Sequence, residues 1–463
     1  MPSNKNTKQF LFHTYAQRKI ALKFSYQGWC YNGLAAQSVP TPLPTVEQTL
    51  WDALCKGRLV DSDKSFDSAG WSRCGRTDKG VSSAGQVVAL WVRSAYTVHN
   101  KPAHIDAFRD ATQPRPVTLT KVQQSQIDSA DESSREGIIE SVQREAYAAH
   151  MEKQRQPTTE HNYIQILNSL LPPSIRVLGW CAVGAQFDAR FDCQRRHYKY
   201  YFDTAASSLG PGVDIHRMQH ALSLFKGEHD FRNFCKVDAS KQIKNFERNI
   251  VDAWIDGPSD TNSSMHCVNL IGSAFLYHQV RCIMAVLFLV GCGRENASVI
   301  TDLMRVNLDP SDPSLPIVTG KPIYDMAHDL PLCLYDCVYD DAKLKWQTSP
   351  GDQEVDEEGE LAQRTNIAKP LIDQLYDLEL KSAMIRNALS HIQPTQTFPT
   401  GDRKNAIPLG GNTFAVSSKF RPLLERERGD TPDEINKRWR ESDKGKRRQK
   451  KSGVDGGDKM SVD

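Results

Sequence analysis

Residues 70–90 read GWSRCGRTDKGVSSAGQVVAL and join a charged, glycine-flanked turn to an apolar run. Residues 75–80 form the turn, and residues 86–91 after it have the composition of a β-strand. A turn that leads directly into a strand places its carboxylate, Asp78, at the mouth of a sheet. The glycines at both ends allow backbone torsions closed to other residues and a close approach by a ligand. The stretch therefore predicts a loop that presents Asp78 to a bound molecule.

The charges around Asp78 indicate what that molecule is. Arg76 and Lys79 favour an ionised carboxylate and attract phosphate, so the loop is suited to holding a polyanion. The alternative is a purely structural turn, in which Asp78 and Thr77 bond to nearby backbone. The spacing matches neither the Walker loop nor the G-x-G-x-x-G dinucleotide motif. The rest of the chain has to decide between these interpretations.

The run GRTDKGV at residues 75–81 resembles the TruA family of tRNA pseudouridine synthases, in which this Asp is catalytic. Further blocks follow in the order of that family, and together they cover residues 18–340 with one interruption. They are KFSYQG (23–28) with Gly33 and Gln37, ARF (189–191) leading to RHYKY (196–200), GEHDF (227–231), FLYHQVR (275–281) and LPL (330–332). The segments WCYNGLA (29–35), LYHQ (276–279) and NKRW (436–439) resemble sequences of the eukaryotic branch of the family, which acts at tRNA positions 38 and 39.

Composition sets the outer limits of the interpretation. The 463 residues suffice for two domains plus tails, and 39% hydrophobic with 25% charged residues is typical of a globular protein with polar insertions. The net charge of +2 means that RNA has to be met by local basic patches. The 11 cysteines lack paired C-x-x-C spacing, which argues against a zinc ribbon. Residues 1–8 are polar, so we expect no secretion signal, reduced thiols, and a location in nucleus and cytoplasm.

Hydrophobic periodicity and turn residues predict the elements of the chain. Strands are expected at 19–25, 65–74, 85–93, 175–183, 249–255 and 265–270. Helices are expected from a capping box at 45–48, at 160–171, 214–226, 278–290 and 370–391. The apolar run 283–290 is too short to span a bilayer, so no membrane association is expected.

Changes in composition divide the chain into segments. They are an N-terminal extension (1–17), an N-terminal half of a catalytic core with the Asp loop (18–96), a polar insertion (97–157), a C-terminal half of the core (158–340), a C-terminal extension with an acidic linker and helices (341–440) and a basic disordered tail (441–463). The resemblance implies an α+β fold of two pseudo-symmetric α/β halves, whose antiparallel sheets flank a central basic RNA-binding cleft. It also implies a homodimer, in which one subunit binds the body of the tRNA that the other modifies.

The chemistry that the resemblance implies explains why one carboxylate is essential. Pseudouridine formation breaks the N1–C1′ bond of uridine, turns the base and rejoins it through C5. Reactant and product have the same composition, so no redox cofactor, nucleotide or metal is expected. Charge develops at C1′ as the bond opens, and Asp78 is suited to meet it. Attack on C1′ and removal of the C2′ proton to give a glycal both remain open.

Three further residues receive roles from the resemblance. Because the uridine has to be flipped out of the RNA stack, Arg76 is expected to fill the vacated space and contact phosphate. Tyr198 is expected to stack on the flipped base, and its hydroxyl is a candidate to take the C5 proton. Arg281 is expected to hold Asp78. The structural alternatives are a strand aromatic for Tyr198 and an arginine reaching water from a helix edge for Arg281.

The remaining candidates are the pocket wall and the phosphate contacts. Phe275, Leu276 and Val280 would wall the uracil pocket, and Thr77 belongs to the substrate-binding loop. The residues expected at phosphates, each with a solvated surface charge as its alternative, are Arg73, Lys79, Arg190, Arg195, Arg196 and Lys199. Cys74 is interpreted as a buried thiol, not a nucleophile. Residues 228–230 (EHD) are interpreted as packing or capping at a helix end, not as metal ligands.

Three competing functions remain at this stage. The first is the same chemistry at another tRNA uridine. The second is an RNA-binding or RNA-folding protein that kept the fold and lost catalysis, against which the presence of Asp78, Tyr198 and Arg281 speaks. The third is a phosphate-loop hydrolase, which the missing Walker Lys-[ST] argues against.

Overall fold

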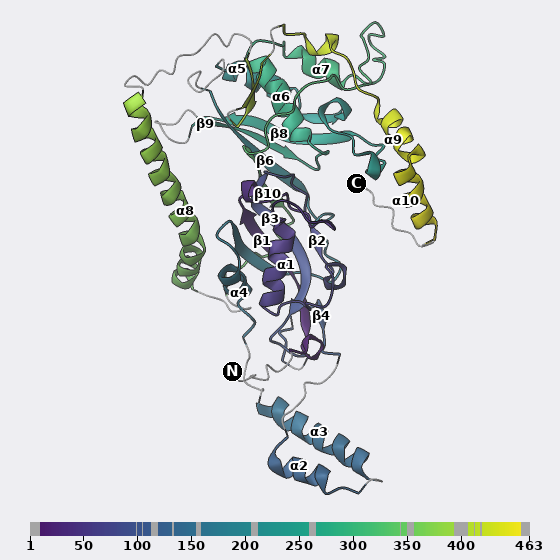
Figure 1. Cartoon of the computed structure of the whole chain (residues 1–463), viewed down its shortest axis with the longest axis vertical. Helices are drawn as coiled ribbons and strands as arrows, with labels where there is room; N and C mark the ends of the chain where they lie inside the picture. The colour runs from purple at the N-terminus through teal and green to yellow at the C-terminus, as the bar shows by residue number, and fades with distance from the viewer. Residues whose placement is uncertain are drawn as a thin grey trace.

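The computed structural model describes residues 10–454, except for 99, 104, 113–118, 132–133, 154–158, 205–211, 259–264, 343, 350–355, 393–405, 412 and 417–418. The molecule is elongated and has a mixed α/β architecture, with a large sheet running through its body and helices on and beside it (Figure 1). Among the described helices, none combines the length and the apolar character that crossing a bilayer would require.

Ten strands form one mostly antiparallel sheet in the order β4-β1-β3-β10-β6-β9-β8-β7, with β2 on β3 and β5 on β1. Their bounds are β1 Gln17–Tyr26, β2 Ser72–Arg73, β3 Ser82–Arg93, β4 Phe108–Arg109, β5 Ile175–Ala182, β6 Arg195–Asp203, β7 Gly227–Asp230, β8 Glu247–Asp256, β9 Met265–Gly272 and β10 Leu332–Val338. A separate hairpin pairs β11 Ala406–Gly410 with β12 Thr413–Val416.

The junction between β3 and β10 makes this one sheet instead of the two that were expected. Cys333 and Leu334 pair in parallel with Ser82 and Ser83, while β10 also pairs antiparallel with β6. The late strand β10 therefore inserts between the strands of the first and second halves. The start of β3, which follows the Asp78 loop, is placed at this junction.

The first half packs two helices on the sheet. The helices α1 (Val46–Lys56) and α4 (Tyr163–Leu170) cover β1, β3 and β5 through a core that includes Leu22, Val88, Leu90 and Trp180. The alternate residues of β3, Val87 and Ala89, belong to a second core on the opposite face. Because both faces are covered, β3 reads as a continuous apolar run.

The second half is built around α6 (Gln279–Gly291), in which every residue except Arg281 is buried. It packs with α5 (Ile215–Ser223) against the sheet, in a core that contains Tyr200, Met218, Leu222 and Phe225. A helix that is apolar on all sides is stable only inside a protein, which explains the run 283–290. The nearby helix α7 (Ser298–Met304) closes this core.

Most predicted elements are confirmed, with ends that shift by a few residues. Thr45 caps α1 by accepting from the Gln48 N–H, although the Gln48 side chain bonds to Asp52, so the reciprocal half of the capping box is not formed. The predicted strand at 65–74 is wrong over most of its length. There Asp67–Ala69 forms a 3-10 turn that ends at Gly70, in a left-handed conformation, and only Ser72–Arg73 joins the sheet.

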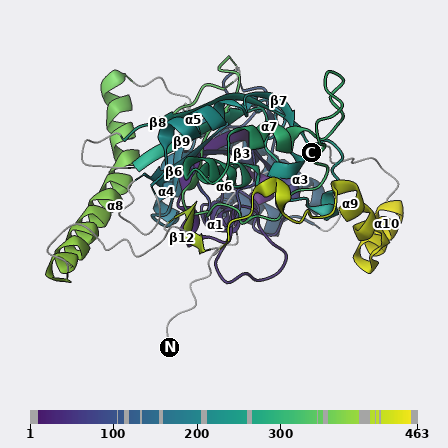
Figure 2. The same ribbon diagram turned by 90° about the horizontal axis from the view of Figure 1, so that it is seen from above.

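The remaining helices lie at the periphery. The helices α2 (Lys121–Asp128) and α3 (Arg135–Lys153) form a hairpin at one end of the molecule, within the predicted insertion, whose Phe108–Arg109 segment pairs with β1 (Figure 1). In the view from above, α8 (Glu357–Ile392) lies on one flank of the sheet, and α9 (Pro432–Glu441) and α10 (Asp443–Val454) lie on the other (Figure 2).

Two predictions for the C-terminal region need correction. The helix expected at 370–391 begins earlier, at Glu357, and contains Pro370. The tail from residue 441 was expected to be disordered, yet Asp443–Val454 is helical, and residues 455–463 lie outside the described chain. Ser442 explains the helix, because its hydroxyl accepts from the Gly445 N–H and its carbonyl from the Lys446 N–H.

Candidate active site

The Asp78 loop connects β2 to β3 and is anchored to β1 through Thr77. The Thr77 hydroxyl lies 2.6 Å from the Tyr26 hydroxyl, and the Thr77 carbonyl accepts from the Leu34 N–H at 3.2 Å. Thr77 is buried, whereas Arg76 and Lys79 are exposed. The side chain of Thr77 therefore points into the protein and fixes the loop. This orientation differs from the expected one, in which Thr77 would contact the substrate.

Two glycines allow the loop to pack closely. Gly33 has a φ of +91°, and a Cβ there would lie 3.2 Å from the Thr77 carbonyl oxygen and 3.3 Å from the Lys79 nitrogen. Gly80 has a φ of +82°, and a Cβ there would lie 2.8 Å from the carboxyl carbon of Asp329. Both positions combine a left-handed backbone with a close neighbour, so any other residue would displace the loop.

The Asp78 carboxyl is partly withdrawn from water, with 27% of its side chain exposed. Burial raises its pKa to about 6, the positive charges of Arg281 and Lys236 oppose this rise, and the negative charge of Asp329 adds to it. At pH 7 the group is still mostly ionised, yet its charge is poorly solvated. A carboxylate in this state is suited to react with developing positive charge.

Arg281 and His278 both approach Asp78 from the start of α6. The Nε of Arg281 donates to the Ala327 carbonyl at 2.7 Å, and its charge acts on Asp78 from beyond ion-pair distance, since the described part of the chain contains no Arg281–Asp78 pair within 4.0 Å. The Nε2 of His278 lies 3.3 Å from Asp78 Oδ2. Arg281 is thus near the predicted partner, and His278 is the closer of the two.

Tyr198 lies on β6 and contacts the predicted pocket wall. Its ring is edge-on to that of Phe275, with the centroids 4.9 Å apart, and Leu276 is buried beside them. Burial raises the pKa of Tyr198 well above its usual value, so the hydroxyl is protonated at neutral pH. These surroundings suit a surface on which a base can stack. Because the Tyr198 hydroxyl is protonated, it can accept the C5 proton only if another base in the complex with RNA removes its own proton.

The predicted phosphate-binding residues fall into three groups. Arg73 and Arg196 are held by the protein: Arg73 pairs with buried Glu47 at 2.6 Å, and Arg196 donates to four carbonyls, those of Cys74, Arg190, Cys193 and Ser273. These contacts tie the start of the Asp78 loop to the second half. Arg76, Lys79 and Arg195 are exposed.

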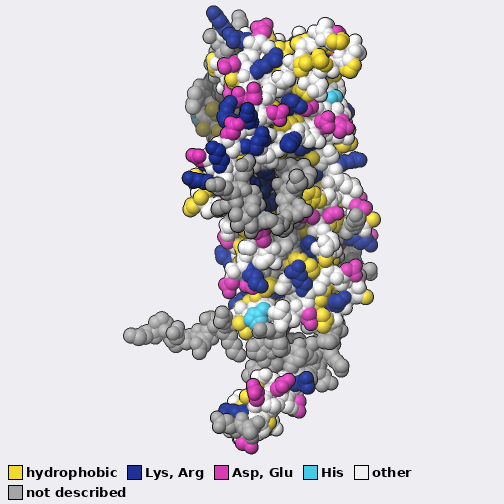
Figure 3. Space-filling model, turned by 90° about the vertical axis from the view of Figure 1, so that its right-hand side faces the viewer, with side chains coloured by type: hydrophobic (Ala, Val, Ile, Leu, Met, Phe, Trp, Pro, Cys, Tyr) yellow, Lys and Arg dark blue, Asp and Glu magenta, His cyan; other side chains and the backbone are white. Residues whose placement is uncertain are grey.

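The other two cations lie beside aromatic rings. Arg190 lies over Phe191, and the Lys199 ammonium is 4.1 Å from the centroid of Tyr335. On the face shown in Figure 3, Lys and Arg side chains are interspersed with Asp and Glu. A contact between any of these side chains and phosphate remains a prediction.

Three groups near Asp78 were not singled out from sequence: His278, Lys236 and Asp329. Their sequence positions are far apart, and they meet because the loop before β10 and the start of α6 converge on the Asp78 loop. The sequence offered one indication for His278, because it lies inside the block FLYHQVR, but a histidine beside a helix is usually explained by packing. No motif in the sequence pointed to Lys236 or Asp329.

The predictions about metals and thiols can be compared with the geometry. No cluster of three or more His, Cys, Asp or Glu side chains suited to a metal ion occurs among the residues that the structure describes. The segment Gly227–Asp230 is an edge strand, not a helix end, and Asp230 pairs with Arg232. Cys74 is buried, as expected.

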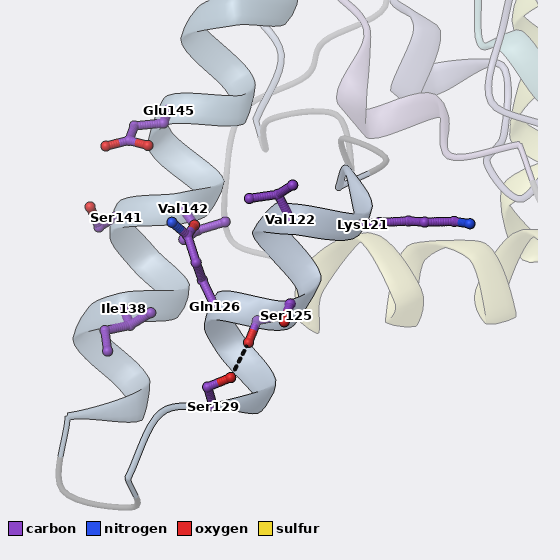
Figure 4. Close-up of a pocket in the computed structure, with 9 residues that line it drawn as sticks. All are labelled: Lys121, Val122, Ser125, Gln126, Ser129, Ile138, Ser141, Val142 and Glu145. Atoms are coloured by element: carbon purple, nitrogen blue, oxygen red, sulfur yellow. Dashed lines mark hydrogen bonds between the residues drawn. The ribbon is translucent and has the colours of Figure 1, made fainter.

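A hollow of about 770 Å³ lies far from this site, between α2 and α3. It is lined by Lys121, Val122, Ser125, Gln126, Ser129, Ile138, Ser141, Val142 and Glu145 (Figure 4). It holds no cluster of reactive side chains.

Comparison with known proteins places the chain in a family. Residues 221–340 match the family described as tRNA pseudouridine synthase. The chain is 35% identical to the tRNA pseudouridine(38/39) synthase of Saccharomyces cerevisiae over 94% of its own length and 81% of that protein. It is 36% and 35% identical to the proteins of that name from Bos taurus and Homo sapiens, over 74% of its length and 59% and 60% of theirs. The chain belongs to the TruA family of tRNA pseudouridine synthases.

Proposed function

We propose that this chain isomerises uridine to pseudouridine in tRNA, at positions 38 and 39 of the anticodon stem-loop. The observation that carries the proposal is the Asp78 carboxyl, partly buried with a pKa of about 6, in a chain of this family. Its loop is held by Tyr26 of the first half and, at its start, by Arg196 of the second half. The yeast and mammalian relatives that bear the name tRNA pseudouridine(38/39) synthase support the choice of target.

Asp78 meets the developing charge at C1′ when the N1–C1′ bond breaks. The base then turns within the pocket and forms the C5–C1′ bond. C5 afterwards loses its proton and N1, which carried none in uridine, takes one up, so the number of protons is unchanged. Phe275 and Leu276 hold the base against Tyr198 and exclude water from the open intermediate. The isomerisation conserves all atoms, so these side chains are the only chemical groups that the proposal requires.

RNA binding follows from the exposed cations at the mouth of the loop. Arg76 and Lys79 lie on both sides of Asp78 and are exposed, so they are placed to contact the backbone of a flipped nucleotide. We propose that the two α/β halves are related by a pseudo-twofold and that tRNA crosses a basic cleft between them.

We also propose a homodimer as the functional form. The helix α8 carries exposed apolar side chains that recur every three or four residues, with one gap of seven. They are Leu371, Leu375, Leu378, Ile385 and Leu389. Such spacing suits packing against another helix. Sedimentation of the whole chain should show a dimer, and Leu375→Glu with Ile385→Glu should yield monomers if α8 forms the contact.

The experiment that tests the function is a pseudouridine map of unmodified tRNA incubated with the purified protein. Asp78→Asn is the test variant, and Asp63→Asn, an exposed carboxyl on a surface turn, is the matched control. Signal at positions 38 and 39 with the natural chain and the control, absent with Asp78→Asn, is expected. Signal at other uridines would overturn the choice of target, and no signal with intact tRNA binding would favour a non-catalytic RNA-binding protein.

A further inference from the structure

His278 has a backbone conformation that is rare for its residue type. It precedes α6 with φ 62° and ψ 12°, in the left-handed region, and its side chain makes no capping bond to the helix. A non-glycine residue in this region costs free energy, and such residues are found where the surrounding structure requires them. The conformation therefore calls for an explanation in what the side chain does.

The imidazole of His278 is directed at Asp78. Its Nε2 lies 3.3 Å from Asp78 Oδ2, only 9% of the side chain is exposed, and the ring of Tyr277 covers it at a centroid distance of 3.8 Å. The N···O distance is longer than the typical 2.9 Å of a hydrogen bond. Such contacts in substrate-free active sites often tighten when the substrate binds.

The charges around His278 keep it neutral. Burial lowers its pKa to about 4, helped by the positive charges of Arg281, Lys236 and Lys321. A neutral imidazole has one N–H, and beside an ionised carboxylate that proton belongs on Nε2. The other nitrogen, Nδ1, is then a bare acceptor, and it is buried without a hydrogen-bond partner within the described structure. The orientation of the ring therefore brings Nε2 to Asp78 but leaves Nδ1 without a hydrogen bond.

We propose that His278 is a positioning residue, which presents its Nε2–H to Oδ2 of Asp78 and so turns Oδ1 toward C1′ of the flipped uridine. This inference rests on the proposed function. Left-handed φ at residue 278 brings the imidazole back from the start of α6 to the loop, and the Tyr277 ring, tilted by 31° against the imidazole, limits its rotation. Arg281 affects the same carboxylate through its charge, while His278 orients it through the Nε2–H contact.

The test compares His278→Gln with His278→Leu in steady-state pseudouridylation of tRNA, which gives kcat and KM. Both variants bear the same left-handed backbone cost, but only Gln keeps an N–H near the position of Nε2. For Leu we expect kcat to fall about 10- to 100-fold with KM for tRNA within about twofold, because misplacing a reacting group lowers rate more than binding. For Gln we expect recovery to within about fivefold. Equal rates for Leu and Gln would overturn the proposal.

A pH profile separates positioning from a merely structural role. Loss of a donor to the ionised carboxylate raises the pKa of Asp78, so the acid limb of kcat/KM should move to higher pH in His278→Leu and return in His278→Gln. The charged groups facing the pair, Arg281, Lys236, Lys321 and Asp329, are the same in both variants. An unchanged limb in the Leu variant would contradict the proposal.

Two controls keep the result interpretable. If the Leu variant does not fold, His278→Asn tolerates the left-handed backbone but is too short to reach Oδ2, so it should fold and lose rate as described for Leu. An Asn variant with the natural rate would overturn the proposal. Pseudouridine formed by the natural chain, with equal rates in all His278 variants, would refute this inference alone, whereas no product from the natural chain would refute the proposed function and this inference with it.

Discussion

The Asp78 loop and the start of α6 meet at one site, yet they contribute in different ways. The loop supplies the Asp78 carboxylate and two exposed cations, all within residues 76–79. The α6 start supplies His278 and Arg281, which act on that carboxylate from about 200 positions away in the chain. One segment therefore carries the carboxylate that we propose to react, while the other contacts it and shifts its pKa, and the two should respond differently to mutation.

Among substitutions that distinguish the two segments, Arg281→Leu is expected to have the largest effect on activity. Removing the positive charge that most strongly opposes the rise should raise the pKa of Asp78 above about 6 and lower kcat/KM at pH 7 by about 10²-fold, with partial recovery at pH 9. Single-turnover rates across pH measure this. Arg217→Leu, an exposed arginine on α5, is the control. An acid limb that stays in place would show that Arg281 does not act on Asp78.

The next effect concerns stability. The folded pKa of Asp78 lies above the ordinary 3.8, so the folded state binds more protons than the unfolded state between about pH 4 and pH 6, and stability falls as pH rises through that interval. Asp78→Asn should therefore raise the free energy of unfolding by at most about 3 kcal/mol at pH 7.5, and by almost nothing below pH 4. Urea unfolding at both pH values measures the gain. A variant less stable at pH 7.5 would contradict the poorly solvated carboxylate.

Within the loop, Gly80 and Gly75 offer a matched pair. Gly80→Ala places a Cβ 2.8 Å from the Asp329 carboxyl in a left-handed backbone, whereas a Cβ at Gly75 meets nothing within 4 Å. We expect Gly80→Ala to lower the free energy of unfolding by about 1–3 kcal/mol and to reduce activity, with Gly75→Ala close to neutral. Thermal melts and single-turnover rates test the pair, and equal effects would show that the approach of Asp329 is unimportant.

The smallest effects should separate two neighbours in the loop. Arg76→Ala should weaken tRNA binding and reduce the slope of log affinity against log salt by about 1, with little change in stability. Thr77→Val should lower stability by about 1 kcal/mol through loss of the Tyr26 contact, with tRNA affinity unchanged. Binding titrations at several salt concentrations and urea unfolding distinguish them. A salt slope altered by Thr77→Val would contradict its inward orientation.

Most of the elements that local patterns predicted are confirmed, and the exceptions lie where tertiary contacts decided the outcome. Strands such as β6 and β10 were not predicted. The buried helix α6 and the strand β3 were visible as apolar runs, since burial on all sides leaves that pattern in a sequence. The strand expected at 65–74 failed because the left-handed Gly70 ends a turn there. The helix α10 was missed because its composition is that of a solvated tail and its cap at Ser442 is a single residue.

Short contiguous blocks of sequence are enough to identify the family, the Asp78 carboxylate and the cations beside it. The surroundings of Asp78, in contrast, depend on the tertiary structure. The inward turn of Thr77, the carbonyl contacts of Arg196, the approach of Asp329 and the direction of His278 depend on β10 entering the sheet beside β3 and on α6 beginning at the loop. The physical reason is that the pKa and direction of a buried group are set by neighbours in space, which a linear pattern does not record.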